Sequence, residues 1–253
     1  MKGPLNHLRR WLLAAMAAVT LVLAVGITAE PASAATLNGS NVNLRACVDL
    51  SNAVCAKPVG TTGSAGIVKM RCWRDGTTVT GNYRSQRWFL VMLTDDREGY
   101  VHSSFVTNQQ NVPECTTLAY VRAADFAIAQ VGRVYASSST AAQYLASDWG
   151  TPYAEWSGDC AKLTGSSYRS TGSDYPKADA IGQYRAFRNA GKILGGIPRY
   201  GSPVFFNVTN WGHTAIYIGG TSIVSTQKLD GARLPVVVQD INSYGSYLGY
   251  ALT

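Results

Sequence analysis

The chain has 253 residues, of which 22 are Lys or Arg and 15 are Asp or Glu, and its formal net charge is +7. This length is enough for one large or two small domains with at least one hydrophobic core. The basic residues are scattered singly along the chain rather than clustered, which argues against a nucleic-acid interface. We therefore expect no nucleic-acid partner.

Residues 1–34 have the order of a secretory signal peptide. Three basic residues precede an apolar run over residues 11–28, and small residues around Ala34 match a signal-peptidase site. An uncleaved membrane anchor is the alternative, but the small residues and the lack of a positive flank after them argue against it. We expect cleavage after Ala34 and secretion of a chain of 219 residues, with 19 basic and 14 acidic side chains and no membrane association.

The sequence predicts a small all-β domain over residues 35–107. Short β-rich runs are separated by Gly, Asn and Asp and cover residues 42–45, 67–73, 88–94 and 99–106. Asp75-Gly76 and Gly81-Asn82 are expected to form tight turns. The segments Asn43-Leu44-Arg45 and Gly99–Val106 resemble those that open and close the bacterial SH3-like module. This resemblance implies a small barrel with a wall-binding or domain-positioning role.

A polar linker is expected over residues 108–116, followed by a second domain over residues 117–253. Apolar residues at helical spacing predict helices at about 117–131, 141–147, 160–168 and 178–190. Asp159 stands where it can cap the third of these helices. The pattern then changes to strands at 203–207, 213–218, 222–226 and 236–240. Helices followed by a meander of strands predict an α+β fold with an antiparallel sheet.

Five cysteines remain after the predicted cleavage, and an oxidising exterior favours their pairing. Cys47, Cys55, Cys72 and Cys115 lie in the first half of the chain, whereas Cys160 stands alone in the second half. Sequence alone allows three pairings of the first four. Proximity along the chain favours Cys47 with Cys55 and Cys72 with Cys115, which leaves Cys160 as a free thiol.

The candidate chemistry follows from elimination. The predicted mature chain has two histidines, His102 and His213, too few for a common three-ligand zinc site, so we expect neither a metal nor a cofactor. Motifs of serine hydrolases, phosphate loops and dinucleotide sites are absent. A thiol in the first turn of a helix is favoured as thiolate, which fits Cys160. His213 follows Gly212 at the start of a β run and is the candidate base, whereas His102 is assigned a structural role.

Three separated segments carry a family resemblance: Trp156–Cys160, Gly201–Phe206 and Gly212–Gly220. They resemble the NlpC/P60 and CHAP group of papain-like cell-wall hydrolases, which have an Asp-Cys at a helix start and a Gly-His-Val-x-Ile-Tyr-Ile-Gly strand. The resemblance covers about residues 117–253. It implies a papain-like Cys-His amidase or endopeptidase that acts on the peptide stem of peptidoglycan, with Cys160 as nucleophile and His213 as base.

The family's third catalytic position, which orients the histidine, falls on Ser225 in this chain. A serine is a weak orienting group, and three alternatives lie nearby: Gln227, Asp240 and Asn242. Family members often have an upstream tyrosine that binds the scissile carbonyl, and Tyr153 is the candidate for it, although it lies nearer to the cysteine than usual. Cys160 is also followed by Ala161-Lys162 where many members have Ser-Gly. We take Tyr153 and Asp159 as candidate substrate-binding residues.

These features together predict a secreted, monomeric cysteine hydrolase whose partner is peptidoglycan or another cell-wall polymer. Two other functions stay open. A free cysteine often only fills a core, so the chain is alternatively a non-catalytic wall-binding or structural protein that has kept the fold. The third function is acyl transfer, in which a cross-linking enzyme uses the same Cys-His pair.

Overall fold

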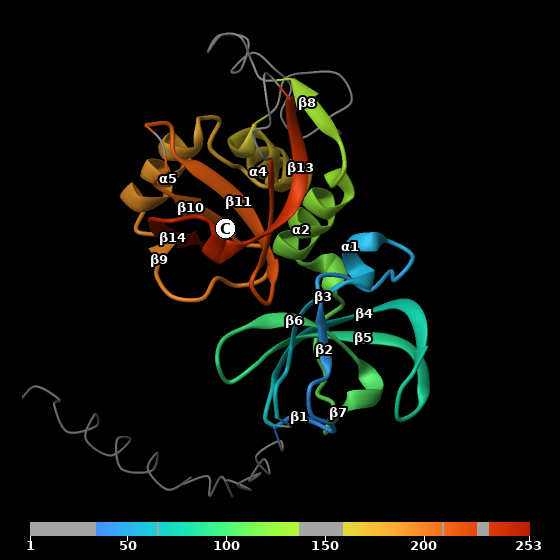
Figure 1. The fold of residues 1–253 in the computed structure, drawn as a ribbon. Coiled ribbons are helices and arrows are strands. Elements are labelled where there is room, and N and C mark those ends of the chain that lie inside the picture. Colours follow the sequence, from blue (N-terminus) through green and yellow to red (C-terminus); the bar gives the residue numbers. More distant parts are fainter. Residues whose placement is uncertain (1–33, 65, 137–158, 209, 227–232) are drawn as a thin grey trace, which may run out of the picture. The chain divides into compact units, whose positions relative to one another are not determined.

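A computed structural model describes residues 34–64, 66–136, 159–208, 210–226 and 233–253. Its contacts group the described residues into one compact unit. The fold is α+β with antiparallel sheets, as the sequence predicted (Figure 1). Within the described ranges, no helix is both long enough and apolar enough to cross a bilayer.

The N-terminal part is an antiparallel sheet with the strand order β3-β2-β6-β5-β4. Its strands are β2 (Asn43–Arg45), β3 (Pro58–Thr61), β4 (Lys69–Thr80), β5 (Arg84–Met92) and β6 (Glu98–His102). A two-stranded sheet joins β1 (Thr36–Leu37) to β7 (Val106–Thr107), and the helical turns are α1 (Ala53–Ala56) and η1 (Ser103–Phe105). The turn predicted at Gly81-Asn82 connects β4 to β5. The likeness to an SH3-like barrel stays a prediction.

The turn predicted at Asp75-Gly76 is wrong, because both residues lie inside β4. The strand has a register irregularity between Asp75 and Val79 where it pairs with β5. At Gly76 a Cβ atom would come within 2.5 Å of the Cβ of Val48, and the Thr77 N–H donates to the Val48 carbonyl at 2.9 Å. Glycine here therefore permits a close approach of two backbone segments rather than a reversal of the chain.

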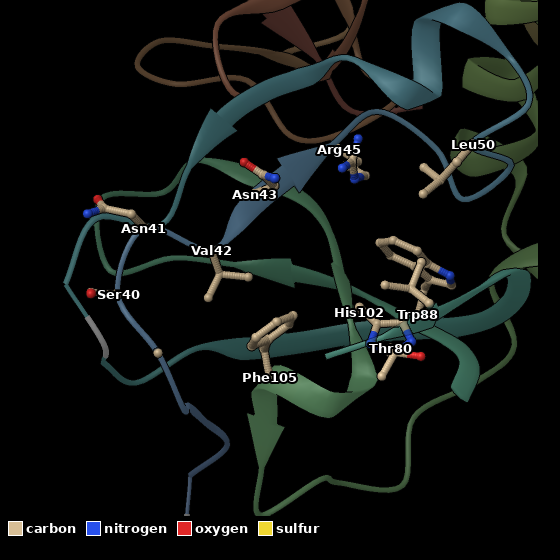
Figure 2. A pocket seen from close by; sticks show the side chains of 12 residues that line it. Ser40, Asn41, Val42, Asn43, Arg45, Leu50, Thr80, Trp88, His102 and Phe105 are labelled. Atoms are coloured by element: carbon tan, nitrogen blue, oxygen red, sulfur yellow. The ribbon is translucent and has the colours of Figure 1, made fainter. Parts of the chain in front are cut away.

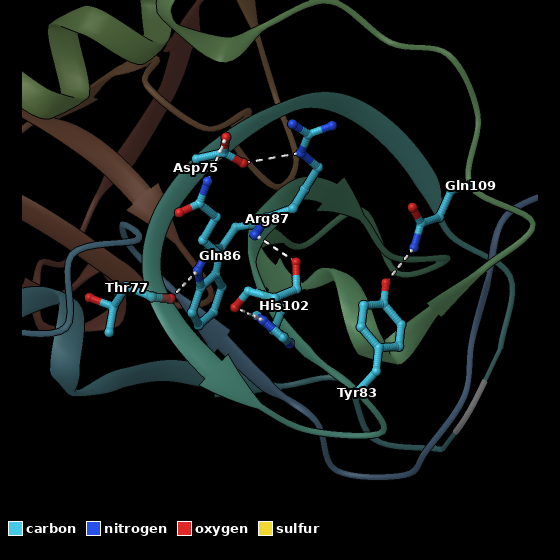
Figure 3. A network of polar contacts seen from close by, with 9 residues as sticks. Asp75, Thr77, Tyr83, Gln86, Arg87, His102 and Gln109 are labelled. Atoms are coloured by element: carbon cyan, nitrogen blue, oxygen red, sulfur yellow. Dashed lines mark hydrogen bonds and ion pairs between the residues drawn. The ribbon is translucent and has the colours of Figure 1, made fainter.

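Hydrogen bonds fix the interior of the N-terminal sheet (Figure 3). The buried indole of Trp88 donates to the Thr77 carbonyl at 3.0 Å, and its ring meets His102 edge to face at 5.1 Å. His102 Nε2 lies 3.0 Å from the Ser85 carbonyl and Nδ1 lies 2.8 Å from the Ser104 hydroxyl. Both ring nitrogens of His102 are thus engaged within the sheet, which agrees with the structural role expected for it.

The predicted linker, residues 108–116, is attached to the N-terminal sheet. The Trp73 N–H donates to the Pro113 carbonyl at 3.0 Å, and the Gln109 side-chain amide donates to the Val106 carbonyl at 2.9 Å. A disulfide between Cys72 and Cys115 closes this connection. The short helix η2 (Cys115–Thr117) then leads directly into the second part of the chain.

The second part is an antiparallel sheet with the strand order β8-β13-β12-β11-β10-β14-β9. Its strands are β8 (Val134–Ala136), β9 (Ile193–Leu194), β10 (Pro203–Phe206), β11 (His213–Gly219), β12 (Ser222–Thr226), β13 (Arg233–Asp240) and β14 (Tyr247–Ala251). The helices are α2 (Ala119–Gln130), α4 (Cys160–Arg169), α5 (Ala180–Asn189) and η3 (Ile241–Ser243). Three predicted helices and four predicted strands correspond to these elements, and the helix expected at 141–147 lies outside the described residues.

Side chains of β11 alternate between the two faces of this sheet. Ile216 and Ile218 belong to the core that includes residues of α2 and α4. Ala215 and Tyr217 belong to the cluster on the opposite face, against which Tyr244 packs. His213 has the same parity as Ala215 and Tyr217, so β11 directs its imidazole toward this second cluster.

The buried carboxylate of Glu98 joins the two sheets. It pairs with Arg71 at 2.8 Å and accepts a hydrogen bond from the Tyr200 N–H at 2.6 Å. The backbone carbonyl of Glu98 accepts from Gly220 N–H at 3.0 Å, and the Tyr200 hydroxyl donates to the Ala46 carbonyl at 2.6 Å. These bonds connect the N-terminal sheet to the loops of the second sheet, and the carboxylate of Glu98 is only 2% exposed, so water competes little for them.

Candidate active site

The candidate nucleophile is the first residue of helix α4. Asp159 precedes it as the N-cap: its carboxylate accepts from the Lys162 N–H at 2.9 Å, and its carbonyl accepts from the Leu163 N–H at 2.9 Å. The predicted cap is therefore confirmed. The helix cannot satisfy the N–H groups of its own first turn, and those of Cys160 and Ala161 hydrogen-bond to the Cys160 thiol instead.

Cys160 is a free thiol, because the other four cysteines of the described chain are paired. Cys47 is bonded to Cys55 and Cys72 to Cys115, the two pairs that proximity favoured. The odd cysteine is thus the one placed at the start of α4.

The candidate base begins strand β11 and is adjacent to the thiol. The backbone N–H of Thr214, the residue after His213, hydrogen-bonds to the Cys160 thiol. Gly212 precedes the histidine with a φ of +70°, and a Cβ there would lie 3.2 Å from the Ile181 nitrogen. Glycine therefore allows the chain to enter β11 close to helix α5, which sets the start of the strand beside Cys160.

Ser225, on the neighbouring strand β12, holds the imidazole. Its hydroxyl oxygen lies 3.0 Å from His213 Nε2 and 2.8 Å from the Thr214 carbonyl. A carbonyl can only accept, so the hydroxyl proton goes to Thr214 and the oxygen accepts from Nε2–H. This arrangement selects the tautomer in which Nδ1 keeps its lone pair and can accept a proton. Ser225 is fully buried, so water does not compete for this bond.

Burial keeps both members of the pair neutral. It raises the pKa of the Cys160 thiol to about 12, helped by the nearby Asp159 carboxylate and opposed by backbone N–H groups. It lowers the pKa of His213 to about 4. The expectation that the helix start favours the thiolate is therefore wrong for the resting state, because loss of solvation and the cap carboxylate together outweigh the hydrogen bonds.

Tyr244 is part of the site but was not identified from the sequence. Its ring is stacked on the imidazole of His213, with centroids 4.4 Å apart and planes inclined by 19°. Its hydroxyl donates to the Gln239 side-chain oxygen at 2.5 Å. Tyr244 follows η3 in a turn between two strands, and no local pattern distinguishes it from the other tyrosines of the chain.

The other residues that the sequence offered for the site do not contact the imidazole or lie outside the described residues. The Asp240 carboxylate accepts from the Thr221 hydroxyl and the Asn242 N–H, both at 2.8 Å, so it caps η3 and is engaged away from the imidazole. Gln227 and Tyr153 lie outside the described residues. Within the described ranges, no group of three or more His, Cys, Asp or Glu side chains is arranged to hold a metal ion.

A hollow of about 360 Å³ lies in the N-terminal sheet, distant in sequence from these residues (Figure 2). Arg45, Leu50, Trp88 and Phe105 are among the side chains that line it. The guanidinium of Arg45 donates to the carbonyls of Cys55, at 3.1 Å, and Ala56, so it is used to hold the end of α1. Arg45, the one charged side chain among the described residues that line this hollow, therefore stabilises the domain.

Fold and site together define an α+β protein with a thiol, an imidazole and a hydroxyl gathered at the ends of one helix and two strands. No protein-family model matches the chain, and a search of the curated proteins finds no match. Similarity is found among solved structures, several of which are NlpC/P60 domains.

Three of these structures illustrate the range of similarity. The P60 domain of an antigen from M. avium subspecies paratuberculosis is 18% identical, with 53% of this chain and 92% of that one covered and a TM-score of 0.39. A hypothetical invasion protein of Mycobacterium tuberculosis is 22% identical, with 53% of this chain and 61% of that one covered and a TM-score of 0.39. An NlpC/P60 family protein from Bacillus cereus is 15% identical, with 87% of this chain and 63% of that one covered and a TM-score of 0.38. The chain spans less than two thirds of the last two, and the function proposed below rests on the residues of the site.

Proposed function

We propose that this protein is a secreted cysteine hydrolase that cleaves amide bonds in the peptide stem of bacterial peptidoglycan. The observation that carries the proposal is the series Cys160, His213 and Ser225, in which the hydroxyl selects the basic tautomer of the imidazole beside the thiol. The substrate class comes from the resemblance of three sequence segments to cell-wall hydrolases and from the predicted signal peptide.

The reaction begins from a neutral thiol and a neutral imidazole. As the Cys160 sulfur attacks the amide carbon, its proton passes to Nδ1 of His213. The backbone N–H groups of Cys160 and Ala161 stabilise the oxyanion. Collapse of the tetrahedral intermediate breaks the C–N bond, and the imidazolium gives its proton to the departing amine. Water then attacks the thioester, with His213 again taking the proton, and the free thiol is restored.

One observation favours a second candidate function, a wall-binding protein without activity. The pKa values of about 12 for Cys160 and about 4 for His213 oppose formation of a thiolate–imidazolium pair, and Ser225 supplies no charge to offset this. In this alternative the fold binds the wall polymer and the thiol is inert.

Digestion of purified peptidoglycan by the wild-type chain and by Cys160→Ala tests the proposal. We expect the wild type to release soluble peptide fragments with new amino groups and Cys160→Ala to release none. Equal release by both proteins would refute the hydrolase, and binding without release would support the second candidate. Products that require an added amine would instead identify an acyltransferase.

A further inference from the structure

The stacking of Tyr244 on His213 suggests a role beyond space filling. A centroid separation of 4.4 Å and an angle of 19° place the two rings nearly parallel, with the face of the phenol against the face of the imidazole. Phe206 supports Tyr244 from another side at 5.0 Å, and it also approaches His213 at 6.1 Å. The imidazole is therefore held by one hydrogen bond in its plane and by an aromatic ring over its face.

The position of Tyr244 is determined by the end of strand β13. Gln239 pairs with Ile223 on β12, and its side-chain oxygen accepts the Tyr244 hydroxyl proton at 2.5 Å. Asp240 caps the turn η3 that lies between these two residues. Donation of the hydroxyl proton increases the electron density of the phenol, which strengthens the attraction of its ring face for a cation.

Proton transfer from the thiol creates a positive imidazolium in a buried site. Burial opposes this cation, and the partner of Nε2 is the neutral hydroxyl of Ser225, which accepts a hydrogen bond but carries no charge. A ring face in contact with the imidazolium supplies an attraction that a neutral hydroxyl does not.

We propose that Tyr244 is a positioning residue that orients the His213 ring and stabilises its imidazolium through the aromatic face, a stabilisation that the uncharged Ser225 hydroxyl does not supply. This inference rests on the proposed function, because the imidazolium arises during that reaction.

Other ionisable groups around the imidazole have defined positions. The Cys160 thiol approaches from α4, where the Asp159 carboxylate acts on the thiol, and burial raises the pKa of the Tyr244 hydroxyl, which therefore stays neutral near pH 7. From β12, the group in contact with the imidazole is the uncharged Ser225. Tyr244 is stacked face to face on the imidazole, whereas the Phe206 ring is tilted by 42° with its centroid 6.1 Å away, so of these two rings the tyrosine is the better placed to attract the positive charge of His213.

Alkylation of Cys160 by iodoacetamide provides the test, because its rate depends on the thiolate–imidazolium pair and needs no substrate turnover. Rates are measured between pH 6 and 8 for the wild type, for Tyr244→Phe, and for a protein with pentafluorophenylalanine at position 244. The last two rings have similar volume, but fluorination removes the attraction of the ring face for a cation. We expect Tyr244→Phe to stay within about 3-fold of the wild type and the fluorinated protein to fall about 3- to 10-fold below Tyr244→Phe. Equal rates for the two rings would overturn the proposal.

The proton affinity of His213 gives a second measurement on the same proteins. Titration of its ring by NMR is expected to give a lower pKa with the fluorinated ring than with Tyr244→Phe, and an unchanged pKa would contradict the cation stabilisation. A wild type that alkylates as expected but releases nothing from peptidoglycan would refute the hydrolase while leaving the role of Tyr244 supported.

Discussion

Removal of the Ser225 hydroxyl should weaken catalysis more than it weakens the fold. In Ser225→Ala, the Nε2–H of His213 loses its acceptor at 3.0 Å and the Thr214 carbonyl loses its donor at 2.8 Å. Ser225 and Thr214 are fully buried, so water does not replace these partners. A hydrogen bond to a group that becomes charged is worth about 1.5–3 kcal/mol, which corresponds to a fall in kcat/KM of about 10- to 100-fold.

The assay is the initial rate of peptide release from peptidoglycan at pH 7, with alkylation of Cys160 measured in parallel. Ser167→Ala is the matched control, because Ser167 is also fully buried and its hydroxyl also donates to a backbone carbonyl, that of Leu163 at 2.8 Å. We expect this control to lose about 1 kcal/mol of stability and less than about 2-fold in kcat/KM. The reasoning fails if Ser225→Ala keeps the wild-type kcat/KM, or if Ser167→Ala loses as much.

Four further predictions concern stability. Burial lowers the pKa of His213 to about 4, so below about pH 6.5 the unfolded chain binds a proton on this imidazole that the folded chain does not. The free energy of unfolding should therefore decrease between pH 6.5 and 4, and His213→Asn should reduce this decrease in urea titrations. The raised pKa of Cys160 acts at alkaline pH, where the unfolded chain loses the thiol proton before the folded chain does. The free energy of unfolding should therefore fall as pH rises from about 9 toward 12, and Cys160→Ala should remove that loss. Joint replacement of Cys72 and Cys115 by Ala should cost about 4 kcal/mol, because the disulfide closes a loop with a sequence separation of 43; a thermal shift below 2 °C would contradict this. Glu98→Gln should destabilise the chain by about 3 kcal/mol, since it removes the buried carboxylate that pairs with the partly buried Arg71, and an unchanged urea midpoint would argue against the connection between the sheets.

Much of the candidate site was predictable because its signals are local. An Asx residue before an apolar helical pattern is a short-range capping signal, and it correctly located Asp159 and Cys160 at the start of α4. A short continuous apolar run after Gly212 likewise predicted the strand that His213 begins. Counting residues by the spacing of the resembled family placed Ser225 at the orienting position, and in the structure its hydroxyl lies 3.0 Å from His213 Nε2.

Other residues of the site could not be found in this way. Tyr244 meets His213 because β13 ends at Asp240, η3 reverses the chain and β10 supplies Phe206 behind the ring. Each of these conditions depends on strand pairings between segments distant in sequence, which local periodicity does not encode. The net pKa shifts of Cys160 and His213 have the same origin, since they come from burial by many segments rather than from the helix start alone.

By itself, the sequence determined the α+β class, the principal helices and strands of the second sheet, and the free thiol beside a capping carboxylate, because composition, spacing and capping act within a few residues. Only the tertiary structure decided that Gly76 serves a close approach instead of a turn, that Glu98 joins the two sheets, and that Tyr244 covers the imidazole. These features are contacts between distant segments, and their energies exist only after the strands have paired and water has been excluded.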